Sequence, residues 1–127
     1  MDRHRILVID DDRTILEMLE LALGKAGFEV ITAADGDEGL RLFKTDTPDL
    51  AIIDVAMPGI DGYEVTERIR LADPDGRTQI VFLTAHDQPV MRSYAQELGA
   101  KLYLTKPVIP SRLIEQIRAL LEEKPTP

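Results

Sequence analysis

Cysteine is absent from this sequence of 127 residues, and histidine occurs only at positions 4 and 86. Without cysteine the chain has no disulfides, thiolate nucleophiles or sulfur-ligated metal sites. Two histidines so far apart in the chain form no metal-binding motif. We therefore expect any metal ion bound here to be held by oxygen atoms.

Positive charge and long apolar runs are also scarce. The chain has 15 Lys and Arg residues against 23 Asp and Glu residues, a formal net charge of -8 and a pI near 4.7. Surfaces that bind nucleic acids or anionic membranes need basic residues to neutralise phosphates, so neither partner is expected. No apolar run approaches the roughly 18 residues that cross a bilayer, and the first residues lead straight into a predicted strand. These features predict a cytoplasmic protein.

Three short runs contain only apolar residues, and each stops at a polar side chain. The runs are residues 6–9, 50–53 and 80–83, followed by Asp10, Asp54 and Thr84. A continuous apolar run of this length favours a strand that is buried on both faces of a parallel sheet. Two mixed segments, 28–33 and 102–104, fit edge strands better than central ones.

Segments with helical periodicity separate these strands. The predicted helix starts are Asp12, Asp35, Asp61, Pro89 and Pro110. Five strands alternating with five helices predict an α/β domain of the flavodoxin-like, doubly wound type, with a five-stranded parallel sheet in the order 2-1-3-4-5. We expect one domain over residues 1–123, and a polar tail or the start of a linker over residues 124–127.

The carboxyl ends of parallel strands meet at one edge of a sheet, where α/β proteins bind their ligands. In the predicted topology this edge carries Asp10, Asp11, Asp54, Thr84 and Lys106. Two carboxylates about 5 Å apart repel by roughly 3 kcal/mol at an effective dielectric of 20, and a hard cation such as Mg²⁺ relieves that repulsion. Lys106 and the Thr84 hydroxyl add donors for a phosphate oxygen. The residues alone therefore predict a Mg²⁺-dependent phosphoryl site with an Asp nucleophile.

The same motifs, taken together, resemble the receiver domain of two-component response regulators over essentially the whole chain. They are Asp10-Asp11, the D-x-x-M-P-G-x-D-G stretch from Asp54 to Gly62, Thr84-Ala85 and Lys106-Pro107. Each motif alone is a weak signal. Their joint order and spacing is a strong one.

The resemblance implies a role for each residue at this edge. Asp54 is expected to be the phosphoacceptor, and Thr84 and Lys106 to contact the phosphoryl group. The implied Mg²⁺ ligands are Asp10, Asp11, Asp54 and the backbone carbonyl of Ala56. The phosphorylated edge is therefore expected to be a magnesium site.

Further positions carry implied roles in switching and in phosphoryl lifetime. Tyr103 is the implied switch aromatic, coupled to Thr84, although alternation with its neighbours also fits plain packing on an edge strand. Ala56 and His86 lie at positions where the family varies, and they are expected to modify the lifetime of the phosphoryl group. The peptide bond between Lys106 and Pro107 is expected to be cis.

The implied function is that of a signalling domain, not of a classical enzyme. The chain is expected to accept a phosphoryl group from a histidine kinase or a phosphotransfer protein, and to catalyse only its own phosphorylation and dephosphorylation. Switching is expected on the surface made by the helix from Pro89, the strand 102–104 and the helix from Pro110. The partner there is an effector domain, another protein or a second copy of the chain. The sequence does not identify the kinase or the output, and it leaves open a stand-alone protein or part of a larger regulator.

Two other classes of protein remain as alternatives. The run from Asp10 to Thr14 matches the D-x-D-x-T motif of haloacid-dehalogenase-type phosphatases, in which Asp10 would be the nucleophile. Such enzymes need a larger core and a late acidic pair, which residues 108–127 do not supply. A flavodoxin-like flavin-binding module is disfavoured, because an acidic edge repels the flavin phosphate.

Overall fold

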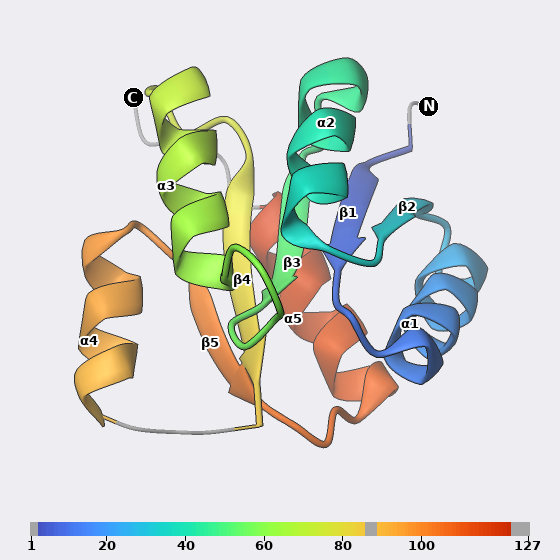
Figure 1. The fold of residues 1–127 in the computed structure, drawn as a ribbon. Coiled ribbons are helices and arrows are strands. Elements are labelled where there is room, and N and C mark those ends of the chain that lie inside the picture. The colour runs from blue at the N-terminus through green and yellow to red at the C-terminus, as the bar shows by residue number, and fades with distance from the viewer. Residues whose placement is uncertain (1–2, 86–88, 123–127) are drawn as a thin grey trace.

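The computed structural model describes residues 3–85 and 89–122, and within them five strands alternate with five helices (Figure 1). In chain order the elements are β1 (Arg5–Ile9), α1 (Arg13–Lys25), β2 (Glu29–Ala33), α2 (Gly36–Asp46), β3 (Leu50–Asp54), α3 (Gly62–Ala72), β4 (Gln79–Thr84), α4 (Pro89–Glu97), β5 (Leu102–Thr105) and α5 (Pro110–Glu122). No helix among these residues is both long and apolar enough to cross a membrane.

All strand pairs in the sheet are parallel, and the strand order is β2-β1-β3-β4-β5. This is the order predicted from the sequence. The three uninterrupted apolar runs form the central strands β1, β3 and β4, and the two mixed segments form the edges. The pairing aligns the strand ends, because Ile9 lies opposite Ile53, and Asp54 lies opposite Leu83. The polar residues that follow the strands are thereby brought to one edge.

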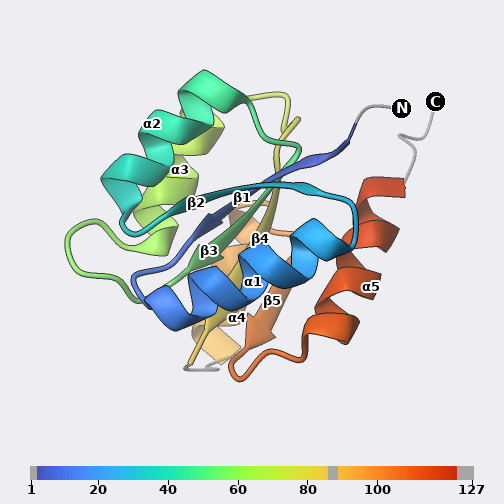
Figure 2. The same cartoon turned by 90° about the vertical axis from the view of Figure 1, so that its right-hand side faces the viewer.

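Helices cover both faces of the sheet. α2, α3 and α4 pack on one face, and α1 and α5 pack on the other (Figure 2). Alternate residues of β1 divide between the two cores: Leu7 and Ile9 face the first, and Ile6 and Val8 face the second. Burial of a side chain of this size contributes about 1.5–3 kcal/mol. Two such cores hold the sheet edge in place.

The predicted helix caps are confirmed. Each side chain accepts a backbone N–H: Asp12 from Thr14 at 2.9 Å, Asp35 from Glu38 at 2.8 Å and Asp61 from Glu64 at 2.9 Å. The side chain of Glu38 reaches back past this cap, and its Oε2 accepts the N–H of Ala34, one residue before Asp35, at 3.4 Å. The first turn of α3 is thus fixed only eight residues after the end of β3.

Arg70 on α3 holds the C-terminal end of α4. Its Nε donates to the carbonyl of Leu98 at 3.3 Å, and its Nη2 donates to that of Gly99 at 3.2 Å. Its Nη1 reaches the carbonyl of Thr78, just before β4, at 3.1 Å. The last carbonyls of a helix have no hydrogen-bond partner within the helix, and they carry partial negative charge. A guanidinium at this end supplies both hydrogen-bond donors and a compensating positive charge.

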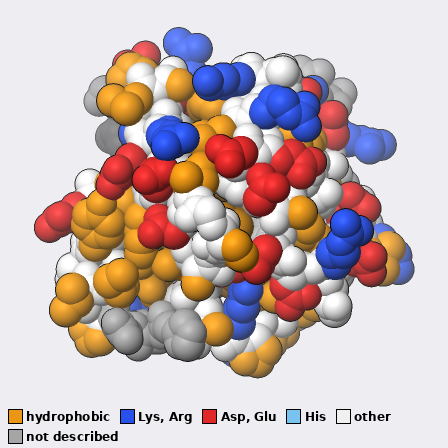
Figure 3. All heavy atoms as spheres, viewed as in Figure 1, with side chains coloured by type: hydrophobic (Ala, Val, Ile, Leu, Met, Phe, Trp, Pro, Cys, Tyr) orange, Lys and Arg blue, Asp and Glu red, His pale blue; other side chains and the backbone are white. Residues whose placement is uncertain are grey.

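Acidic side chains spread across the middle of the face shown in Figure 3, over α2 and α3, whereas most Lys and Arg side chains there lie toward its upper end and its right margin. Hydrophobic side chains are more frequent on the left, over α4. The acidic middle of the face accords with the net charge of -8. Such a potential favours cations over phosphate polymers.

Candidate functional site

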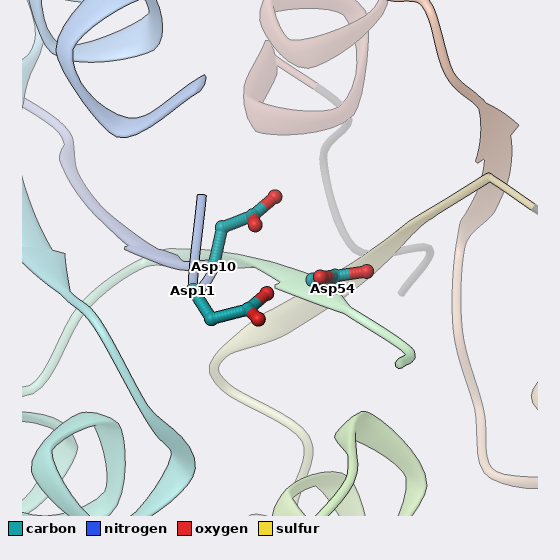
Figure 4. A group of neighbouring side chains, drawn as sticks. All are labelled: Asp10, Asp11 and Asp54. Atoms are coloured by element: carbon teal, nitrogen blue, oxygen red, sulfur yellow. The ribbon is translucent and has the colours of Figure 1, made fainter. Parts of the chain in front are cut away.

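Three carboxylates meet at the carboxyl edge of the sheet. Asp10 and Asp11 follow β1 directly, and Asp54 is the last residue of β3. One oxygen from each lies within 4.8 Å of the other two. Figure 4 shows Asp10 and Asp11 extending from the end of β1 on the side where Asp54 lies. Asp10 and Asp54 are buried, at 1% and 4% exposure, whereas Asp11 is open to solvent.

The Asp10 side chain is held from both sides. Its Oδ1 accepts the N–H of Asp12 at 2.9 Å, and its Oδ2 lies 3.0 Å from Nζ of Lys106. Oδ2 is fully buried and accepts no well-aligned hydrogen bond from the residues that the structure describes, so the contact with Lys106 is mainly an ion pair. A buried oxygen with spare lone pairs is a free position for a cation.

Asp54 is fixed through both its side chain and its backbone. Its Oδ1 accepts the N–H of Ala56 at 3.3 Å, and its Oδ2 lies 3.5 Å from Nζ of Lys106. The chain then folds back, so that the N–H of Gly62 donates to the carbonyl of Val55 at 2.9 Å. A Cβ on Gly62 would lie only 2.4 Å from the carbonyl oxygen of Asp54. Glycine is therefore required where α3 begins against the end of β3.

The electrostatics of this edge favour an added cation. Burial, and then the charge of Asp10, raise the pKa of Asp54 from 3.8 to about 7, although Lys106 opposes the shift. Burial lowers the pKa of Lys106, but the carboxylates of Asp10 and then Asp54 raise it by more, so the lysine stays charged. One lysine does not neutralise three carboxylates. With a pKa raised to about 7, Asp54 is only partly ionised near neutral pH when no cation is bound.

Three more of the predicted site residues, Thr84, Lys106 and Ala56, lie around this cluster. Thr84 ends β4 at the same edge and is buried, and its carbonyl accepts the N–H of Lys106 at 2.7 Å. The Lys106-Pro107 peptide is cis, as the resemblance implies. Ala56 is exposed beside the carboxylates. His86 lies outside the described residues.

Tyr103 belongs to an aromatic group on the α3 and α4 side of the sheet. Its neighbours on β5 face the opposite core, as alternation predicts. Its ring lies edge-on to Phe82, with centroids 6.3 Å apart, and its hydroxyl is 3.5 Å from that of Tyr63. Arg92 lies over the ring at 4.9 Å and donates to the Tyr103 carbonyl at 3.3 Å.

We did not predict Tyr63, Arg92 or the close approach of Gly62 from the sequence. Tyr63 occurs in the capping run after Asp61, where an aromatic residue fits ordinary packing. Its position in the first turn of a helix that begins beside the site is the one signal that marks it. The partner on β5 is 40 residues away, so spacing alone does not reveal the pair.

Comparison with known proteins identifies the family. The family model for the response regulator receiver domain matches residues 6–118. This chain belongs to the response regulator receiver family. The receiver domain has the fold expected of it, since the receiver domain protein (CheY-like) from Methanospirillum hungatei JF-1 superposes with a TM-score of 0.89. That structure is 30% identical, and the match covers 95% of each chain.

Curated relatives of the receiver domain include transcriptional regulators. The probable transcriptional regulator ycf27 of Cyanophora paradoxa is 39% identical over 127 residues, which is all of this chain and 52% of that protein. The alkaline phosphatase synthesis transcriptional regulatory protein PhoP of Bacillus subtilis is 39% identical over 120 residues, 92% of this chain and 48% of that protein. The receiver domain thus spans about half the length of these relatives.

The alternative of a haloacid-dehalogenase-type phosphatase is not favoured. The family match accounts for the chain from residue 6 to residue 118. The local geometry also argues against the D-x-D-x-T interpretation, because the carboxylate of Asp12 accepts the N–H of Thr14 as the cap of α1. The second acid of the motif is thus committed to a helix start.

Proposed function

We propose that this receiver domain accepts a phosphoryl group on Asp54 from the phosphohistidine of a histidine kinase or a phosphotransfer protein. The observation that carries the proposal is the Asp54 carboxylate itself. It is buried at the end of the central strand β3, 3.5 Å from Lys106 and grouped with two further carboxylates. In the reaction an oxygen of Asp54 forms a bond to phosphorus while the bond from phosphorus to the donor imidazole breaks, and that imidazole takes up a proton.

The carboxylate group fits Mg²⁺, which takes oxygen ligands. The proposed ligands are Asp10, Asp11, Asp54 and the backbone carbonyl of Ala56. When bound, the ion supplies charge neutralisation for the carboxylates and for the phosphoryl oxygens. The grouping of the three carboxylates supports this assignment, because one oxygen from each lies within 4.8 Å of the other two and Lys106 supplies only one opposing charge.

In this proposal two side chains bind the phosphoryl oxygens. The Lys106 ammonium contacts Asp54 already, and it supplies a point charge for a transferred phosphoryl group. The hydroxyl of Thr84, at the end of the adjacent strand β4, supplies a hydrogen-bond donor. The chain thus catalyses only its own phosphorylation and dephosphorylation in this proposal.

The switch in this proposal runs from Thr84 to Tyr103, and from there to the surface of α4, β5 and α5. A phosphoryl group adds charge and acceptor oxygens. It shifts a two-state equilibrium only by the difference in its interaction free energy between the two states. The partner on that surface is an effector domain, another protein or a second receiver. The names of the relatives as transcriptional regulators support an output in transcription, in a cytoplasmic setting.

Incubation with acetyl phosphate and Mg²⁺ is expected to place one phosphoryl label on Asp54, mapped by mass spectrometry. Asp54→Asn protein should take up no label, and a chelator should abolish labelling of the parent, since the buried carboxylates then repel the phosphate. Asp75→Asn, a change to an exposed aspartate in the turn after α3, is the control and should label normally. Label on Asp10 instead would contradict the proposal.

The lifetime of the phosphoryl group is expected to depend on Ala56. Its methyl group offers no hydrogen bond to a water that attacks the phosphorus, although the residue is exposed beside Asp54. Ala56→Asn should shorten the lifetime by about fivefold, the worth of one hydrogen bond to that water. Loss of label with time in Mg²⁺ buffer measures it. Ala72→Asn, at the exposed end of α3, is the matched control. Equal rates of label loss in all three proteins would show that the side chain at position 56 does not affect the phosphoryl lifetime.

A further inference from the structure

Two buried tyrosines from distant segments meet through their hydroxyl groups. Tyr63 lies in the first turn of α3 and is 6% exposed, and Tyr103 on β5 is 9% exposed. Their hydroxyl oxygens are 3.5 Å apart, and either one can donate. This distance is long for a pair of hydroxyls, for which about 2.7–2.8 Å is usual, so a small movement of either ring decides whether the bond forms well.

The Tyr63 ring is fixed by its neighbours. It lies edge-on to Phe82 of β4 at 5.2 Å and edge-on to Tyr94 of α4 at 5.1 Å. The hydroxyl of Tyr94 in turn donates to Glu67, one helical turn after Tyr63. Edge-on aromatic pairs of this kind contribute about 0.5–1.5 kcal/mol beyond their burial. The hydroxyl of Tyr63 is thus presented to Tyr103 from a packed position.

Burial, and then the hydrogen bond with Tyr103, raise the pKa of Tyr63 above its ordinary value. Tyr63 therefore remains a neutral phenol, which can both donate and accept. It suits a partner hydroxyl in either orientation.

The residue before Tyr63 touches the phosphoacceptor strand. The N–H of Gly62 donates to the carbonyl of Val55, and a Cβ on Gly62 would overlap the carbonyl of Asp54. The start of α3 is therefore in direct contact with the end of β3. A path of direct contacts runs from Asp54 through Gly62 to Tyr63 and across the hydroxyl pair to Tyr103.

We propose that Tyr63 is a positioning residue that holds Tyr103 in its buried place and connects it to the loop after Asp54. This contact acts in addition to the route through Thr84, and its part in switching rests on the function proposed above. The burial of Tyr103 by Tyr63 does not depend on phosphorylation.

The chain has three tyrosines and no tryptophan, which suits labelling with 3-fluorotyrosine and ¹⁹F NMR. Tyr103→Phe assigns its signal, and a soluble paramagnetic agent reports how exposed that ring is. Tyr63→Phe should raise the ratio of exposed to buried Tyr103 by about twofold, because a hydroxyl pair 3.5 Å apart lies at the weak end of the range for one hydrogen bond. Tyr94→Phe is the matched control. It removes a hydroxyl from the same aromatic group without touching Tyr103, and should leave the ratio unchanged.

The same samples with beryllofluoride and Mg²⁺ test the link to Asp54. Tyr63→Phe should reduce the change in the Tyr103 signal on binding, while labelling of Asp54 by acetyl phosphate stays at the parent level. If the Tyr103 signal and its exposure were the same in Tyr63→Phe and Tyr94→Phe, the inference would be wrong, although Asp54 could still be labelled. Absence of any label on Asp54 would instead overturn the proposed function. The exposure of the Tyr103 ring in Tyr63→Phe would then still test the positioning role of Tyr63.

Discussion

The Lys106→Met protein is expected to be strongly destabilised when no Mg²⁺ is present. In the parent the Lys106 ammonium lies 3.0 Å from Asp10 and 3.5 Å from Asp54, and both carboxylates are buried. Breaking a buried ion pair by removing one partner costs about 3–5 kcal/mol. Because Lys106 is partly exposed, we expect the free energy of unfolding to fall by about 3 kcal/mol. In a domain of this size the loss corresponds to a decrease of about 10 °C in Tm. Thermal unfolding in chelator measures it.

Addition of Mg²⁺ should recover most of that loss, because a divalent cation neutralises the same carboxylates. Lys101→Met is the control, since it removes the same charge from an exposed lysine just before β5. It should change Tm little with or without the metal. Equal destabilisation in the two variants would show that net charge, and not the contact of Lys106 with the carboxylates, sets the effect.

The second large effect is expected from Asp54→Asn, which should make the metal-free domain more stable at pH 8. Burial, and then Asp10, raise the pKa of Asp54 from 3.8 to about 7 in the folded state. Ionisation of Asp54 therefore costs free energy in the folded state that it does not cost in the unfolded chain. Each pKa unit corresponds to about 1.4 kcal/mol, so the gain is a few kcal/mol at most.

The sign of the pH dependence follows from where the proton is held. Below about pH 4 both states hold the proton, and Asp54 then costs the fold no ionisation free energy. Between about pH 4 and pH 7 the folded state alone keeps the proton, so the free energy of unfolding decreases as the pH rises through the folded pKa. Above about pH 7 Asp54 is ionised in both states, and its contribution to the free energy of unfolding no longer changes with pH. The Asn variant lacks this slope.

Denaturant unfolding of parent and Asp54→Asn in chelator, from pH 4.5 to pH 8.5, tests the expectation. The two curves should separate as the pH rises, and Mg²⁺ should narrow the gap at pH 8. Asp75→Asn, in an exposed turn, should follow the parent throughout. Parallel curves for parent and Asp54→Asn would mean that the Asp54 carboxylate is ionised at little cost in the fold.

Much of the fold was predictable because its signals are local. Uninterrupted apolar runs identified the central strands, mixed runs identified the edges, and acids before helical periodicity identified the caps. The strand order then followed from which strands are buried on both faces. Asp10, Asp11 and Asp54 were placed together for the same reason, since parallel strands bring their carboxyl ends to one edge.

The contacts that the sequence did not predict are those between side chains far apart in the chain. Nothing near Arg70 indicates that its guanidinium reaches the carbonyls of Leu98 and Gly99. Likewise the hydroxyl of Tyr63 meets that of Tyr103 only because α3 and β5 pack against the same part of the sheet. Such pairs depend on helix rotation and side-chain rotamer, which periodicity leaves undetermined.

The hold of Arg70 on one end of α4 determines how that helix can respond to a change at the site. Because Arg70 of α3 bonds the carbonyls of Leu98 and Gly99, just after α4, any rotation of α4 would pivot at its C-terminal end. The nine residues from Pro89 to Glu97 span about 13 Å, so a rotation of about 10° displaces the first turn by about 2 Å. That turn carries the exposed Val90. A small rotation about one end of α4 would thus produce a displacement of the size of an interatomic contact at the other end.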